Sequence, residues 1–120
     1  MIEIRGAGKI ASKKNRTRLA TVGGKARAFK HKDVVDFEKM LQQLAHISMR
    51  GREPIVSNVC MYLDVVFGDN RARDLQNCFG SICDALNGIV YVDDSQIVKI
   101  VASKVIIKNE WSFRIKVEEL

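Results

Sequence analysis

Apolar and polar residues alternate along the chain in patterns typical of regular secondary structure. Residues 1–5 alternate apolar and charged side chains, which predicts a short strand. Asp33 is a suitable N-cap for a first helix, because apolar residues recur at helical spacing after it and the stripe fades near Met49. The predicted apolar stripe of this helix consists of Val34, Phe37, Leu41, Leu44 and Ile47.

The run from Ile55 to Phe67 predicts a second strand. Alternate residues from Val59 to Phe67 are apolar and share one face, whereas Asp64 points to the other face. A second helix is predicted from about Arg73, and Asn87-Gly88 is a suitable stop for it. Its apolar stripe consists of Leu75, Phe79, Ile82 and Leu86.

The remaining chain reads as extended segments. We expect a brief extended piece at 89–92, a turn at 93–96, and a hairpin formed by strands at 97–107 and 111–118. The predicted order is β-α-β-α-β-β, with a long basic loop after the first strand. It indicates one α+β domain over residues 1–120, a mixed β-sheet with two helices packed on it.

Charge is distributed unevenly, although the chain as a whole has a net charge of only +6. Residues 1–32 carry ten Lys or Arg and one acidic residue, whereas residues 33–120 carry a net charge of −3. Segment 6–32 therefore predicts a flexible arm that binds a polyanion such as DNA, and a solvated basic surface is the alternative. The candidate DNA contacts are Lys9, Lys13, Lys14, Arg16, Arg18, Lys25 and Arg27, with Arg71 and Arg73 near the second helix.

Other features of the sequence narrow the class of protein. No run approaches the roughly 18 apolar residues of a membrane span, and the start has no apolar signal region, so we expect a cytoplasmic protein without a membrane partner. The three cysteines form no C-x-x-C pair. We interpret them as buried apolar residues, with a zinc site or a nucleophilic thiol as alternatives.

Three aspartates are candidates for a metal site. Asp74 lies at the start of the second helix, and Asp93 and Asp94 lie in the turn after it. Each has a structural explanation as a capping or turn residue. A helix of about 14 residues spans roughly 20 Å and a five-residue extended return covers roughly 17 Å, so the pair can come back near Asp74. Clustered carboxylates favour Mg²⁺ or Mn²⁺, and such a metal can activate water for phosphodiester hydrolysis.

The segments "RDLQN", "CDALNG" and "DDSQI" make the sequence similar to a known family. They resemble the RusA family of Holliday junction resolvases of bacteria and their phages. The resemblance implies a homodimer that binds four-way DNA junctions and nicks opposed strands with Mg²⁺ in the cytoplasm of a bacterial or phage-infected cell. It also implies three catalytic positions, which fall at Asp74, Gln76 and Asp94.

Two of these positions depart from the family pattern. Gln76 stands where the family has an acid, and Gly80 stands where it has a lysine. Gln76 still offers a carbonyl oxygen to a metal but brings no charge. Asp64, Asp69 and Asp84 are possible substitutes, of which Asp64 is favoured because it lies off the apolar face of its strand, whereas Asp84 reads as structural.

Three hypotheses follow. The first is an Mg²⁺-dependent, structure-selective endonuclease that resolves Holliday junctions in DNA recombination and repair. The second is a branched-DNA-binding protein whose catalysis is impaired or lost at Gln76 and Gly80. The third is a basic scaffold protein whose aspartates only cap helices and turns. His31 and His46 are lone histidines far apart in the sequence, so they do not indicate a histidine-based site. The "GAGK" stretch is too short for a phosphate-binding P-loop.

Overall fold

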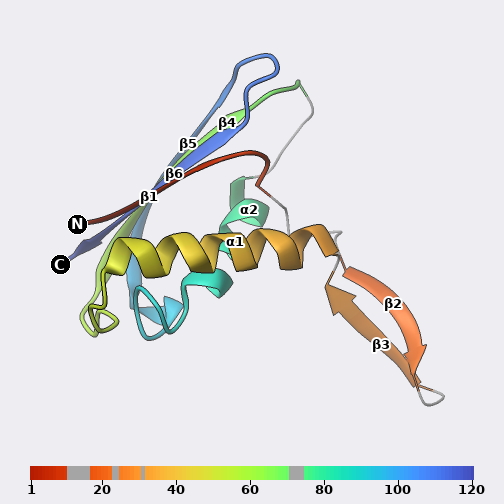
Figure 1. Cartoon of the computed structure of the whole chain (residues 1–120), viewed down its shortest axis with the longest axis horizontal. Coiled ribbons are helices and arrows are strands. Elements are labelled where there is room, and N and C mark those ends of the chain that lie inside the picture. The colour runs from red at the N-terminus through yellow and green to blue at the C-terminus, as the bar shows by residue number, and fades with distance from the viewer. Residues whose placement is uncertain (11–16, 23–24, 31, 71–74) are drawn as a thin grey trace.

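A four-stranded mixed sheet is the framework of the protein (Figure 1). The computed structural model describes residues 1–10, 17–22, 25–30, 32–70 and 75–120. The strands of the main sheet are β1 (Ile2–Ala7), β4 (Val59–Phe67), β5 (Ile97–Ile106) and β6 (Ser112–Glu119). The helices are α1 (Lys32–Met49) and α2 (Leu75–Leu86), with a short 3₁₀ helix η1 (Asp94–Gln96) before β5.

The spatial order of the strands is β1-β6-β4-β5. β6 pairs antiparallel with both β1 and β4, whereas β4 and β5 are parallel. Parallel strands cannot be joined by a tight turn, so the chain between β4 and β5 crosses over through α2. The predicted α+β class, with a mixed sheet and two helices, is confirmed.

The predicted hairpin between the last two strands is wrong, because β4 lies between β5 and β6. The connection from Ile107 to Trp111 passes over the end of β4. Ile107 N donates to Phe67 O at 2.9 Å, and Asn109 N donates to Gly68 O at 3.0 Å. Alternation of apolar residues defines the faces of a strand but not its neighbours, so the sequence pattern fits either pairing.

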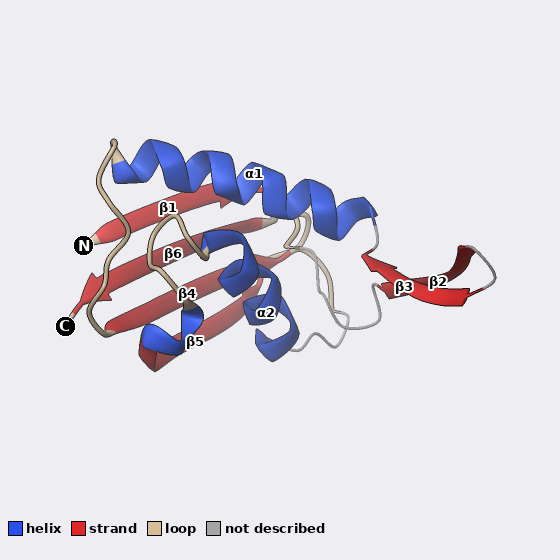
Figure 2. Cartoon of the chain, turned by 90° about the horizontal axis from the view of Figure 1, so that it is seen from below, coloured by secondary structure: helices blue, strands red, loops and turns tan. Residues whose placement is uncertain are grey.

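The basic segment is also more ordered than predicted. Strands β2 (Thr17–Val22) and β3 (Lys25–Lys30) pair antiparallel within it, with Val22 opposite Lys25. The expectation of a loop throughout 6–32 is therefore wrong for these two strands. Gly23-Gly24 separates them in the sequence, and two glycines are typical between the strands of a tight hairpin. Figures 1 and 2 show the hairpin standing away from the main sheet, beyond the N-terminal end of α1.

The core lies between one face of the sheet and the two helices (Figure 2). The helix stripe predicted for α1 is confirmed at its start, but Ile47 is 71% exposed, and Ala45 and Met49 are buried instead. Counted from Leu41, each step of three residues falls about 60° short of a full helical turn, so Ile47, two such steps on, faces away from the core. Steps of four overshoot a turn by only about 40°, so Ala45 and Met49 stay nearer the core. The core residues that β4 contributes are the predicted ones: Val59, Met61, Leu63, Val65 and Phe67.

The second helix packs beside α1 on the same face. Ile82 and Leu86 of its predicted stripe are fully buried, and Leu75 and Phe79 are partly buried. Tyr91, beyond the helix, is the largest fully buried side chain among the described residues. Within the described part of the chain, no helix has the length and apolar character needed to cross a membrane.

Two glycines provide a test of this packing. A Cβ built at Gly80 in α2 meets nothing within 4 Å, whereas one at Gly68 lies 2.4 Å from Nε1 of Trp111. We expect Gly80→Ala to raise the free energy of unfolding by about 1 kcal/mol, because alanine restricts the unfolded chain and favours helix. Gly68→Ala should lower it by about 1–3 kcal/mol through overpacking. Urea denaturation of both variants measures these changes. A stabilised Gly68→Ala would contradict the close packing of Trp111 against Gly68 at the end of β4.

Candidate active site

The acidic turn between α2 and β5 is a capped 3₁₀ helix. Asp93 is its N-cap, and Oδ2 of Asp93 accepts a hydrogen bond from Ser95 N at 3.1 Å. Gln96 completes the capping box, since its Oε1 accepts from Asp93 N at 2.9 Å. The hydrogen bonds from Ser95 hold the pKa of Asp93 below its usual value. The predicted turn at 93–96 is thus confirmed, and Asp93 has a structural role in it.

Gln96 also ties this turn to the body of the protein. Its Nε2 donates to Ile55 O at 2.7 Å and to Ser57 O at 2.8 Å. Because these carbonyls belong to the segment just before β4, the turn is fixed at the N-terminal end of the central strand. We did not single out Gln96 in the sequence, although the D-x-x-Q spacing of a capping box was a usable signal.

The chain reaches this turn by a tighter path than predicted. Ile89 N and Val90 N both donate to Leu86 O at 3.1 Å, so the chain turns at the end of α2. Gly88 has the expected positive φ, at 78°. The predicted extended piece at 89–92 is therefore wrong: of these residues only Tyr91 makes bridges, with Ile55 and Asn87.

Asp94 lies near the last turns of α2. Burial raises the pKa of the Cys83 thiol to about 12, a hydrogen bond from Tyr91 opposes this shift, and the negative charges of Asp94 and Asp84 add to it. Burial also raises the pKa of Tyr91, whose hydroxyl donates to Cys83 O at 3.2 Å. In the sequence, Asp84 was interpreted as structural and not as part of the candidate site. In the structure, the charges of Asp84 and Asp94 both act on Cys83 and Tyr91.

Burial makes the three cysteines poor candidates for catalytic thiols. Cys60, Cys78 and Cys83 are all free and buried. A thiol with a raised pKa, such as that of Cys83, stays protonated at neutral pH and is a poor nucleophile. The interpretation of the cysteines as buried apolar residues is confirmed.

The structure tests only part of the predicted site. Gln76 lies in the first turn of α2 with an exposed side chain. Asp74 lies outside the described residues, as do Arg71 and Arg73, so its predicted proximity to Asp94 stays a prediction. Among the residues that the structure describes, no group of three or more His, Cys, Asp or Glu is arranged to hold a metal ion. The candidate donors are oxygen atoms of carboxylate and amide groups, which suit Mg²⁺, but a complete set would need Asp74.

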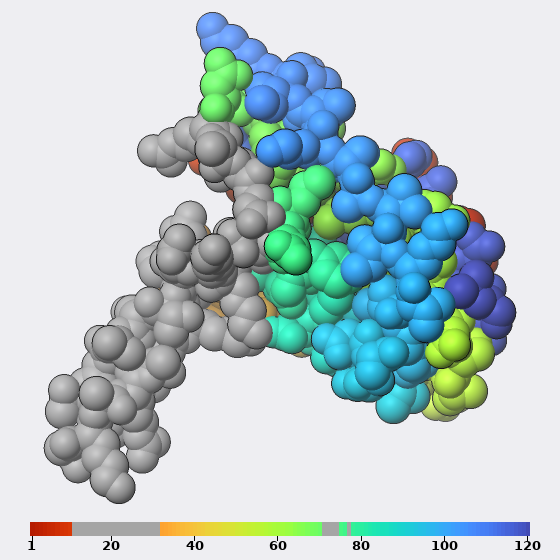
Figure 3. Space-filling view, turned by 180° about the vertical axis from the view of Figure 1, so that it is seen from behind, coloured from red at the N-terminus to blue at the C-terminus, as the bar shows by residue number. Residues whose placement is uncertain are grey.

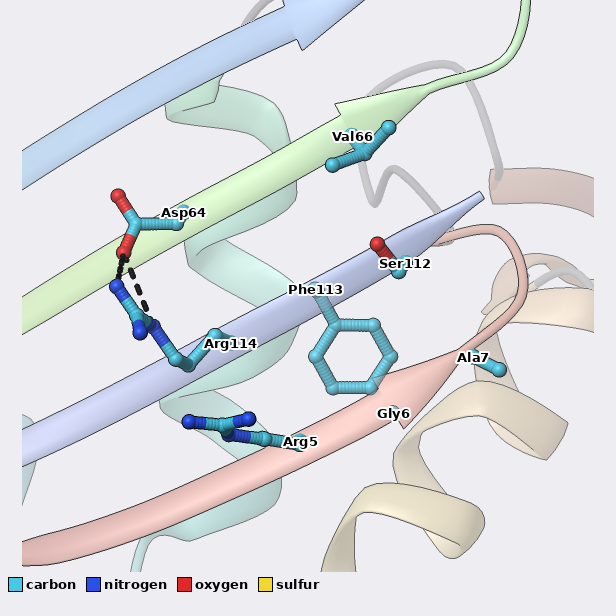
Figure 4. A pocket seen from close by; sticks show the side chains of 8 residues that line it. All are labelled: Arg5, Gly6, Ala7, Asp64, Val66, Ser112, Phe113 and Arg114. Carbon is cyan, nitrogen blue, oxygen red and sulfur yellow. Dashed lines mark hydrogen bonds and ion pairs between the residues drawn. The ribbon is translucent and has the colours of Figure 1, made fainter. Parts of the chain in front are cut away.

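Two of the three possible substitutes for the missing acid, Asp64 and Asp69, lie away from Asp94. Asp64 lies on the sheet face opposite the helices, where Arg114 Nη2 donates to its Oδ2 at 2.9 Å (Figure 4). Ser103 Oγ donates to the other oxygen, Oδ1, at 2.7 Å. Asp69 follows the C-terminal end of β4, whereas Asp94 precedes β5. Because these strands are parallel and pair over nine residues of β4, the two carboxylates lie at opposite ends of the sheet, roughly 25–30 Å apart.

The basic residues predicted to contact DNA are only partly described. Lys9 Nζ lies 4.7 Å from the centroid of the Trp111 ring, a cation–π contact at the start of the basic segment. Arg18, Lys25 and Arg27 belong to the β2–β3 hairpin. Lys13, Lys14 and Arg16 lie outside the described residues.

Comparison with known proteins gives one result. Residues 9–118 match the model of the family described as Endodeoxyribonuclease RusA. The match therefore covers most of the basic segment, both helices and three of the four strands of the main sheet, β4, β5 and β6, but not β1. A search of curated proteins found no match.

The contacts of Gln96 generate a prediction about the turn. Gln96→Ala should lower the free energy of unfolding by about 1–3 kcal/mol, because it removes one capping contact and leaves two backbone carbonyls with fewer donors. It should also speed amide hydrogen exchange at Asp93, because the N–H of Asp93 loses its acceptor, Gln96 Oε1. Gln43→Ala, at an exposed position of α1, is the matched control and should change neither quantity.

The ion pair of Asp64 generates a prediction about pH. Hydrogen bonds from Ser103 and Arg114 lower the pKa of Asp64, so the pair stabilises the fold above the unfolded-state pKa. This contribution is lost as pH falls through the lowered pKa of the folded state. Asp64→Asn should thus cost under about 1 kcal/mol at pH 7, since both side chains are partly exposed.

Urea denaturation at pH 7 and in acid measures this difference. The wild-type and Asp64→Asn curves should converge in acid, below the folded-state pKa. A difference that is independent of pH would show that the carboxylate charge contributes nothing.

Proposed function

We propose that this chain, which belongs to the RusA family of endodeoxyribonucleases, resolves Holliday junctions by paired nicks in DNA recombination and repair. The observation that carries the proposal is the family match over residues 9–118. The basic arm supports it, because a segment with a net charge of +9 in residues 1–32 suits a phosphate backbone. The protein would bind this DNA in the cytoplasm. Because the contacts are made to phosphates, the affinity for DNA should fall steeply as the salt concentration rises.

A divalent cation, Mg²⁺ or Mn²⁺, is part of the proposal. Asp74 and Asp94 would hold it through carboxylate oxygens, and Gln76 would offer a carbonyl oxygen. Asp93 would add negative charge beside Asp94 while it caps the turn. The cation would activate water and stabilise charge on the phosphate. Arg71 and Arg73 would bind phosphate oxygens of the DNA.

Within this proposal, the turn at 93–96 positions Asp94 for its role. Its capping box and the two Gln96 contacts fix the backbone on both sides of Asp94. A carboxylate on a fixed backbone loses less conformational entropy when it binds a cation than one on a mobile loop. Gln96 is in this sense a positioning residue rather than a catalytic one.

A second candidate function is junction binding without cleavage. Gln76 makes the proposed site less negative by one unit than the family pattern, and Gly80 removes a cation near the phosphate. Both changes would weaken metal binding and the stabilisation of charge on the phosphate, and both leave the basic arm intact. Binding and cleavage must therefore be measured separately.

The test is a nicking assay on a synthetic four-way junction with Mg²⁺ and, separately, Mn²⁺, alongside a gel shift on the same DNA. We expect paired nicks that Asp94→Asn reduces by about 100-fold or more, because it removes a metal ligand, with little change in binding. Asp36→Asn, at an exposed position of α1, changes the net charge equally and is the control. Cleavage that survives Asp94→Asn would contradict the assignment of the site.

Tight junction binding with no cleavage would favour the second candidate. The double variant Gln76→Asp, Gly80→Lys would then restore the family pattern, and the open space around Gly80 accommodates the larger side chain. Recovery of nicking in that variant would identify these two positions as the cause of the loss.

A further inference from the structure

The connection between β5 and β6 forms a fixed tip at one end of the main sheet. We call residues 104–110 the tip. Glu110 N donates to Ile107 O at 2.9 Å, which closes a turn, and Asn109 N donates to Gly68 O at 3.0 Å. The second bond ties the turn to the residue that follows β4. Figure 3 shows the tip in blue beside the green residues that end β4.

Two consecutive isoleucines lie exposed on the tip. The exposed fraction is 51% for Ile106 and 43% for Ile107. Ile106 pairs in register with Phe67, which is buried, so Ile106 lies on the core face of the sheet where the described helices leave it half exposed. The charged residues of the tip, Lys104, Lys108 and Glu110, sum to +1. The tip therefore combines an apolar surface with a charge that does not repel DNA.

A hollow of about 430 Å³ opens beside Ile106, between the tip and the residues that follow β4. One of its walls is apolar, two carry side-chain amides, one carries a carboxylate and one carries a cation. Apolar side chains pack against an extruded base, and amide and carboxylate groups hydrogen-bond with base edges. The groups around the hollow thus suit a nucleic acid base. The lining residues are Gly68, Asp69, Asn70, Ile106, Lys108 and Asn109.

Asn109 holds its side-chain amide from a fixed backbone. Its φ is 64°, in the left-handed region, and its N–H is bonded to Gly68 O. Asparagine is one of the few residues other than glycine that tolerate this conformation. A side chain on a fixed backbone loses less conformational entropy when it binds than one on a mobile loop.

The hollow lies close to the candidate active site along the chain. Asn70 precedes Asp74 by four positions, and four residues span at most about 14 Å. Because B-DNA rises by about 3.4 Å per base pair, this distance corresponds to about four base pairs. A base in the hollow would therefore lie within a few base pairs of a phosphate held at Asp74.

We propose that the tip binds the branch point of the junction, where one unstacked base enters the hollow beside Ile106 and hydrogen-bonds with the amides of Asn70 and Asn109. The inference rests on the proposed function, which supplies the four-way junction. Base stacking is interrupted where strands exchange, so a base there costs less free energy to displace than one inside a duplex. The apolar contact with Ile106 offsets part of that cost.

Fluorescence of 2-aminopurine, a base analogue that brightens when it is unstacked, tests the role of Ile106. The analogue is placed at the branch point of a synthetic junction and, as a reference, in the middle of an arm. Protein is added to saturation, judged by gel shift, without divalent metal. We expect the signal to rise about twofold or more at the branch point only. Ile106→Ser should remove about half of this rise or more, whereas Ile47→Ser, on the exposed surface of α1, should not.

Asn109→Gly tests whether the hollow reads the base. Glycine accepts a positive φ, so this variant keeps the turn and removes only the side-chain amide. Competition gel shifts, again without metal, compare four junctions that differ only in the branch-point base pair. We expect the wild type to prefer one of them, and Asn109→Gly to reduce that preference about fivefold or more.

The outcomes separate this inference from the proposed function. A branch-point signal that is absent, or insensitive to Ile106→Ser, would overturn the inference even in a protein that nicks junctions. Equal affinity of the wild type for all four junctions would overturn the role of the amides. An Ile106-dependent signal without nicking would uphold the inference and contradict the proposed nuclease, and a wild type that binds no junction would overturn both. Thermal melting confirms that each variant is folded.

Discussion

The pairing of β4 with two different strands is the constraint on which the rest of the structure depends. β4 is hydrogen-bonded to β5 on one side and to β6 on the other, and its alternate residues from Val59 to Phe67 are buried against the helices. A strand held on both edges and on one face has little freedom to shift, because a slip of one residue would turn its apolar residues to solvent. It therefore serves as the fixed reference for the rest of the fold.

The parallel pairing of β4 with β5 determines where the candidate site lies. The chain must return from the end of β4 to its beginning, and it does so through α2 and the turn at 93–96. This turn is then held at the N-terminal end of β4 by Gln96, which contacts the carbonyls of Ile55 and Ser57. Asp94 is thus placed by the crossover, whereas Asp69 is carried to the other end of the sheet.

The protein separates its charges from its core. The basic residues gather in the N-terminal segment, whose β2–β3 hairpin stands apart from the main sheet (Figure 1). The main sheet and helices supply a mildly acidic body. Asp64 shows how structural context changes the meaning of a residue. Its position off the apolar face of β4 suggested a catalytic substitute, but its partners Ser103 and Arg114 make it part of a surface ion pair.

By itself, the sequence determined the class of fold, the faces of its elements and its family. Periods of two and 3.6 residues reveal which side chains must be buried, so the core positions of β4 and most of those of the helices were predictable. The motifs around "DALNG" and "DDSQ" were enough to indicate the RusA family, because they are local in sequence.

Only the tertiary structure decided which strands are neighbours and which side chains meet. The apolar pattern of β5 and β6 is the same whether they pair directly or with β4 between them, so the hairpin prediction failed. The contacts of Gln96 join residues about 40 positions apart, and no local pattern encodes them. Asp84 and Asp94 act on the same buried groups because the chain turns immediately after Leu86. Such proximity depends on long-range packing, which a periodic pattern does not specify.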